Sequence, residues 1–227
     1  MTADLMDNDK CVTVGEPGWH SLGKNFKHEI TAEEAHAEMG GSFELFQKPV
    51  GVQFEDEFVA IPNSFAIVRG PTNKDEKNVV FGYATKNYHV VQPIEIIKKF
   101  DEKVGVSISS MGLIQDGRKL FLCWQLPTFE VVKDDPIDLY GSVLFGFDKI
   151  FSSRLNVGTV RIVCKNTFMS NINESEREKK LNRGRGTIYS GKHSNRNLLY
   201  ELGEWMGHIQ EKSENEKNMI QGFFKKL

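Results

Sequence analysis

The sequence predicts an α+β fold, with a mainly antiparallel sheet, flanking helices and a C-terminal helical segment. Apolar and β-branched runs bounded by turn residues predict strands that pair as hairpins. Stretches with apolar residues three and four positions apart, together with capping residues, predict the helices. These strands and helices do not alternate regularly, which argues against a doubly wound parallel sheet.

The first helix is predicted over residues 31–40. Thr31 can cap its N-terminus, Glu34 completes a capping box three residues later, and Gly40 suits its C-terminal end. Strands follow at Phe58–Ile61, Phe65–Val68 and Val79–Phe81. Pro62-Asn63 and the turn at residues 70–73 separate them, so we expect antiparallel hairpins.

A second helix is predicted from Gln92-Pro93 to Gly105, because proline suits the first helical turn. After it we expect a hairpin that turns at Asp116-Gly117. Two further strands are predicted at Leu139–Phe147 and Val157–Cys164. The tail from Asn195 is predicted to be helical, with Leu198, Leu202, Trp205 and Ile209 on one face. Docking of that face on the sheet and self-association remain open alternatives.

The predicted organisation is a core domain over residues 1–175, a basic glycine-containing linker or loop over 176–196, and a C-terminal helix over 197–227. A chain of 227 residues that is 39% hydrophobic can bury a sizeable core. It contains no apolar run of bilayer length and no secretory signal at its start, so we expect a cytoplasmic protein without a membrane association.

The three cysteines are far apart and form no C-x-x-C motif, so neither a disulfide nor a zinc site is expected. Cys123 and Cys164 are predicted to be unpaired thiols buried in strands. Trp19, between Gly18 and Gly23, is predicted to be buried and to anchor the N-terminal arm. The chain shows no H-E-x-x-H and no G-x-S-x-G motif, so we predict no catalytic residue, metal or cofactor.

The segment from Arg177 to Arg196 has the most unusual composition. It contains seven cations and the single acid Glu178, a local charge of +6 in a chain whose formal total is −2. The glycines at 184, 186 and 191 allow an irregular backbone. Cations, glycines and an aromatic ring together suit a phosphate backbone with unstacked bases. A solvated loop with no ligand is the competing interpretation.

Several motifs, read in order, resemble a known family. They are W-H-x-L-G at Trp19–Gly23, GYATKNYHVVQ at Gly82–Gln92, DGRKLFLCWQLP at Asp116–Pro127, V-R-x-V-C-x-N-T from Val160 and GKHSNRN at Gly191–Asn197. The chain resembles the uncharacterised phage/plasmid-like protein family over nearly its whole length. The resemblance implies a gene carried by phages or plasmids and expressed in a bacterial host. The order of elements also resembles, at fold level only, the Rad52-type single-strand annealing proteins.

The leading hypothesis is a non-enzymatic single-stranded nucleic-acid-binding protein, acting on DNA or RNA in recombination or replication as a homo-oligomer. The predicted binding residues are Arg177, Lys179, Lys180, Arg183, Arg185, Tyr189, Lys192, His193, Arg196, Arg161, Lys165 and Tyr88. Two alternatives remain open. One is a nucleic-acid or nucleotide-processing enzyme with a site assembled in the fold around His20, His89 and His193. The other is a phage protein that binds a host protein through a helical face at Trp205 and Phe223.

Overall fold

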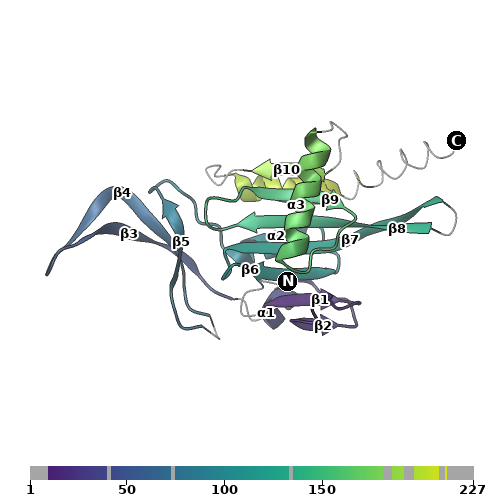
Figure 1. The fold of residues 1–227 in the computed structure, drawn as a ribbon, viewed down its shortest axis with the longest axis horizontal. Helices are drawn as coiled ribbons and strands as arrows, with labels where there is room; N and C mark the ends of the chain where they lie inside the picture. The colour runs from purple at the N-terminus through teal and green to yellow at the C-terminus, as the bar shows by residue number, and fades with distance from the viewer. Residues whose placement is uncertain are drawn as a thin grey trace.

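The computed structural model describes residues 10–39, 42–72, 75–132, 135–180, 186–191, 197–209 and 213. Its centre is a seven-stranded sheet in the order β10-β9-β8-β7-β6-β1-β2 (Figure 1). The strands are β1 (Cys11–Val14), β2 (Lys24–Phe26), β6 (Ser110–Ile114), β7 (Lys119–Val132), β8 (Asp135–Gly146), β9 (Ser153–Gly158) and β10 (Gly186–Gly191). All neighbours pair antiparallel except β1 and β2, so the predicted α+β fold is confirmed.

Helices cover both faces of this sheet. Helices α1 (Ala32–Met39) and α2 (Pro93–Lys103) and a C-terminal helix over residues 198–209 pack on one face, and α3 (Lys165–Lys180) runs across the other (Figure 1). Alternate residues of a strand point to opposite faces. In β7, Leu122 and Trp124 accordingly join the larger core, whereas Phe121 and Cys123 pack beneath α3. The run LFLCW from Leu120 to Trp124 is therefore apolar throughout because neither face meets water.

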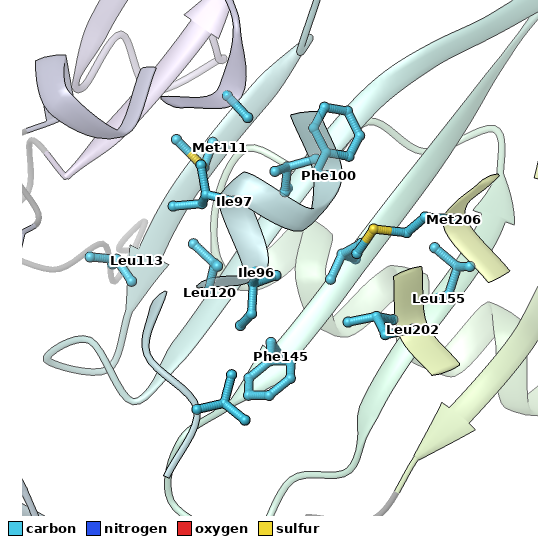
Figure 2. Packing of buried hydrophobic residues seen from close by; sticks show 14 of the residues in the cluster. Ile96, Ile97, Phe100, Met111, Leu113, Leu120, Phe145, Leu155, Leu202 and Met206 are labelled. Atoms are coloured by element: carbon cyan, nitrogen blue, oxygen red, sulfur yellow. The ribbon is translucent and has the colours of Figure 1, made fainter. Parts of the chain in front are cut away.

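The larger core lies between the sheet and the α2 face. Figure 2 shows Ile96, Ile97 and Phe100 of α2 pointing at the strands, with Leu202 and Met206 of the C-terminal helix beside them. Gly203 lets this helix approach α2 closely, because a Cβ there would lie 2.7 Å from the Cδ atom of Lys99. Lys103 of α2 donates to Glu204 at 2.8 Å. The structure thus places the apolar face of residues 198–209 on the sheet.

The predicted capping box of the first helix is confirmed. The amide of Glu34 donates to the Thr31 hydroxyl, and the Thr31 amide donates to the Glu34 carboxylate. At the start of α2, the Gln92 amide donates to the Glu95 carboxylate at 2.6 Å, and the Gln92 side chain bonds to the backbone of Leu45. Gly105, just beyond the end of α2, has a φ of 63°, a left-handed conformation that glycine adopts without strain.

A second sheet of three strands, in the order β3-β4-β5, projects from the main body (Figure 1). It consists of β3 (Leu45–Gln53), β4 (Phe58–Arg69) and β5 (Val79–Ala84), all antiparallel. The expected break at Pro62-Asn63 is wrong, because β4 runs unbroken through both residues. Asn63 takes a φ of 57° and the β3 register shifts between Pro49 and Gly51, so an irregularity absorbs the proline within the strand.

Two expectations near the main sheet also need correction. The strand predicted at Val157–Cys164 ends at Gly158, because the chain leaves the sheet to enter α3. Cys164 therefore lies just before α3 and not in a strand, although it is a buried free thiol as predicted. Cys123 is a buried free thiol inside β7, as predicted.

Candidate nucleic-acid interface

The basic segment flanks one edge of the main sheet. Its first cations, Arg177, Lys179 and Lys180, belong to the last turn of α3. Residues 186–191 form β10, which pairs with β9 as the edge strand, so this part of the predicted loop is a strand. Arg183, Arg185, Lys192, His193 and Arg196 lie outside the described residues. The segment is thus tied to the sheet edge by α3 on one side and by β10 in its middle.

Tyr189, which we expected to stack on a base, is engaged within the fold. Its ring is half-buried and lies 6.3 Å from the ring of Trp205, and its hydroxyl donates to Glu201 at 2.9 Å. Burial, and the hydrogen bond to the Glu201 carboxylate, raise the pKa of Tyr189 above its usual value. Gly191 allows this packing, since a Cβ there would collide with Leu198 and Tyr189. Tyr189 therefore attaches β10 to the C-terminal helix.

Tyr88 and Arg161 also have intramolecular roles here. Tyr88 is 9% exposed and belongs to the larger core, so its ring has little face to offer a base. The Arg161 guanidinium donates to the carbonyl oxygens of Glu16 at 2.7 Å and Val14 at 3.0 Å, and also to that of Ser109. It ties the N-terminal strand region to the entrance of α3. Both terminal nitrogens of the Arg161 guanidinium thus donate to backbone carbonyl oxygens.

Two cations that the sequence reasoning missed, Lys119 and Arg154, lie against the ring of Phe151, and the predicted Lys165 is near Lys119. The Lys119 Nζ atom lies 5.2 Å from the centroid of the Phe151 ring, and the Arg154 Cζ atom lies 5.6 Å from it. Phe168 of α3 lies 5.4 Å from Phe151, ring to ring. Lys165, the first residue of α3, is close enough to Lys119 to affect its titration. We call Lys119, Arg154, Lys165 and Phe151 the basic–aromatic cluster.

The cluster concentrates positive charge in a partly buried place. Burial lowers the pKa of Lys119, Asp148 partly offsets this effect, and the charge of Lys165 adds to it. Asp148 accepts hydrogen bonds from the amides of Ile150 and Phe151, and Glu176 pairs with Arg154 at 3.1 Å. Two carboxylates thus lie among three cations. A phosphate group beside Lys119 would relieve the repulsion between these cations.

One end of this cluster adjoins the basic segment. Arg154 in β9 lies directly opposite Ser190 in β10, whereas Lys119 lies in β7, two strands further into the sheet. Lys119, Arg154 and Lys165 come from β7, β9 and α3, which are far apart along the chain. Read along the sequence, each of these three cations is an ordinary charged residue beside a strand or helix. Only the antiparallel order of the strands could have revealed their proximity.

Two of the motifs that carry the resemblance, the one at Trp19–Gly23 and the one that begins at Val160, contact each other. The ring of His20 accepts a hydrogen bond from the Leu22 amide at 2.9 Å and lies 2.9 Å from the Val163 carbonyl oxygen, to which its other nitrogen donates. The Thr167 hydroxyl accepts from the amides of Val163 and Cys164 at the start of α3. The W-H-x-L-G and V-R-x-V-C-x-N-T motifs therefore form one structural junction.

Trp19 is not buried, so that expectation is wrong. It is 59% exposed, and its ring only touches the His20 ring edge-on at a centroid distance of 5.3 Å. His20 carries the anchoring role instead, because an imidazole can bond to two backbone groups at once. Gly18 fits over the imidazole, where a Cβ would lie 3.1 Å from its atoms.

The next residues to consider are those predicted for the two alternative functions. His20 faces backbone groups, His89 is exposed, and His193 lies outside the described residues. In the described ranges, no three His, Cys, Asp or Glu side chains gather as metal ligands would. Trp205 is half-buried against the core, and Phe223 lies outside the described residues. No helix in the described part of the chain has the length and apolarity to cross a bilayer.

Comparison with known proteins gives one match. Residues 80–182, a little under half of the chain, match a family model described as a domain of unknown function, DUF932. This range runs from β5 to α3 and includes Lys119, Arg154 and Lys165. Over these residues the chain is similar to an uncharacterised family. Neither the curated proteins nor the solved structures yield a match.

Proposed function

We propose that this protein binds single-stranded nucleic acid along the β9–β10 edge of its main sheet. The observation that supports the proposal is that cations from separate elements converge beside the most basic part of the sequence. The basic–aromatic cluster contributes Lys119, Arg154 and Lys165, and the segment from Arg177 to Arg196 contributes seven further cations.

The mechanism is electrostatic capture of the phosphate backbone. Each phosphate that meets a lysine or arginine releases condensed counterions, which drives binding without base-specific contacts. Because Tyr88 and Tyr189 are engaged in packing, base stacking contributes little and sequence preference is slight. The formal net charge of −2 predicts weak binding by a single copy. Two or more copies on one strand would supply the missing affinity through avidity.

The finer biological assignment is also part of this proposal. The family motifs favour a phage or plasmid gene whose product acts in the cytoplasm of a bacterial host. A role in recombination or replication, as a single-strand annealing protein, rests on the fold-level analogy alone. Strand annealing would require binding without sequence preference, which agrees with an electrostatic mechanism.

Binding of a fluorescent single-stranded oligonucleotide, with duplex as comparison, tests the proposal at several salt concentrations. Log affinity should fall with log salt by about 0.7 per phosphate contact on a single strand. Replacing Arg183, Arg185 and Lys192 together by Ala should flatten this slope by roughly two units. Replacing Lys119, Arg154 and Lys165 by Gln should have a similar effect.

A matched control removes three exposed lysines from outside the cluster, namely Lys27, Lys77 and Lys98. It makes the same change in net charge, so it should leave the slope within about half a unit of the parent. An affinity that does not depend on salt would remove the proposal. An equal loss of salt slope in the cluster variant and in the control would also remove the proposal, because the effect would then follow net charge alone.

The alternative in which the protein binds a host protein was predicted on a helical face at Trp205 and Phe223. Trp205 is half-buried against the core, which leaves only part of its ring for a partner, and Phe223 lies outside the described residues.

A further inference from the structure

The projecting sheet ends in a two-stranded ribbon. β5 pairs with β4 only at Phe65–Arg69, whereas β3 pairs with β4 as far as Gln53 and Phe58. Residues 49–63 therefore form a ribbon of two strands that extends beyond the third strand (Figure 1). We call residues 49–63 the arm. An isolated two-stranded ribbon is only marginally stable in water.

One face of the arm is apolar and exposed. Val52 lies directly opposite Val59, and Ile61 follows on the same face two residues along β4. These three side chains are each about half exposed. Phe54, near the tip, is 58% exposed. A contiguous apolar strip on a ribbon that has no core of its own indicates a surface that packs against another molecule.

The edges of the arm disfavour the addition of a strand. Pro49 in β3 and Pro62 in β4 have no amide hydrogen to donate to a neighbouring backbone. Proline on an edge strand is a common protection against edge-to-edge pairing. The apolar face, and not either edge, is therefore the part of the arm suited to contact.

The charges of the arm indicate what it contacts. Residues 49–63 contain no lysine or arginine, and Glu55, Asp56 and Glu57 form the tip. Such a ribbon would be repelled by nucleic acid and by an anionic membrane surface. A protein surface with an apolar strip and a basic end would complement it.

The base of the projecting sheet, at the end away from the acidic tip, supplies the basic groups of such a surface. Tyr83 of β5 is 54% exposed, and the Lys149 Nζ atom lies 5.9 Å from the centroid of its ring. Lys48 in β3 and Lys86 just after β5 are also exposed. The projecting sheet thus has an acidic tip, an apolar middle and a basic base. The seven residue-to-residue steps from Lys48 to Glu55 span about 23 Å when extended.

We propose that the arm pairs with the arm of a second copy, face to face and antiparallel, about a two-fold axis. This arrangement buries Val52, Val59 and Ile61 of both copies together, as two sheets pack in a sandwich. It also sets each acidic tip over the basic base of the partner copy. The same patch serves both copies, which is the property of an isologous interface. The inference is independent of nucleic-acid binding, because it involves no residue of the basic–aromatic cluster.

Sedimentation of the full chain over a range of concentrations tests the pairing. The parent should sediment as a dimer. Val59→Thr combined with Ile61→Thr should sediment as a monomer with an unchanged thermal midpoint, because threonine keeps the preference for strands and these side chains are outside both cores. A dimer that persists in this variant, or a parent that stays monomeric at 50 µM (about 1.3 mg/ml), would overturn the inference.

Charge reversal provides a second test that does not alter the apolar face. A tip variant carries Glu55, Asp56 and Glu57 changed to Lys, and a base variant carries Lys48 and Lys86 changed to Glu. Each should be monomeric by itself, since like charges then meet at both ends of the pair. An equimolar mixture should dimerise, because each tip then meets a base of opposite sign. Failure of the mixture to dimerise, while the parent does, would overturn the antiparallel arrangement.

Discussion

Replacement of His20 by Ala should destabilise the protein by about 2–3 kcal/mol, although His20 lies in a surface loop. The imidazole joins the Leu22 amide to the Val163 carbonyl oxygen through two contacts of 2.9 Å. A typical intramolecular hydrogen bond contributes about 1 kcal/mol, and a partly buried group left without a partner adds to the loss.

The expected change in melting temperature follows from the size of the chain. An unfolding entropy of about 2.1 cal/mol/K per residue gives roughly 0.5 kcal/mol/K for 227 residues. The His20→Ala variant should therefore melt about 4–6 °C below the parent in calorimetry. The melting temperature of His20→Gln should fall between those of the parent and of His20→Ala. The glutamine amide can restore a donor to Val163 but does not reproduce the geometry of the ring.

Trp19→Ala is the matched control in the same loop. Its ring is 59% exposed, so its removal should cost less than about 1 kcal/mol despite its size. A His20→Ala variant that melts within 1 °C of the parent would refute the role assigned to the junction. A larger loss for Trp19→Ala than for His20→Ala would refute it as well.

Three further outcomes are expected. Labelling with a thiol reagent should leave the native protein unmodified and modify it after denaturation, because Cys11, Cys123 and Cys164 are buried and burial raises the pKa of Cys11 and of Cys123 to about 12. Gly141→Ala should lower the free energy of unfolding by about 1–3 kcal/mol in urea titrations, since its Cβ would lie 2.3 Å from the Trp124 ring. Burial lowers the pKa of His36, so the unfolded chain takes up the proton first as pH falls. Stability should therefore decrease below about pH 6.5, and His36→Gln should flatten that decrease in thermal scans.

Short-range patterns in the sequence predicted much of the fold. The capping box at Thr31 and the proline at position 93 located two helices, and Asp116-Gly117 located the β6–β7 turn. These signals succeed because the groups that bond are three or four residues apart. Pro62-Asn63 failed as a strand break for the opposite reason. A proline can sit in a strand whose amide faces no partner, and only the sheet topology decides that.

The candidate site was predicted only in part. The sequence located the basic segment, because an excess of cations is visible without any fold. It could not assign roles to the aromatic residues. A tyrosine between charges looks the same whether it stacks on a base or, like Tyr189, donates to a carboxylate twelve positions along the chain. The anchoring role was predicted for Trp19 and not for His20 for the same reason, since the partner of His20 is 143 residues away.

The sequence by itself determined the fold class, the caps, the apolar C-terminal face and the local charge near β10. Those properties depend on neighbours along the chain. Only the tertiary structure brought Lys119 and Arg154 to the ring of Phe151, with Lys165 near Lys119. It alone joined the motifs at Trp19 and Val160 through His20, and left the apolar face of the arm uncovered. The physical reason is that strand order and helix docking are set by the burial of the whole core, which no local pattern encodes.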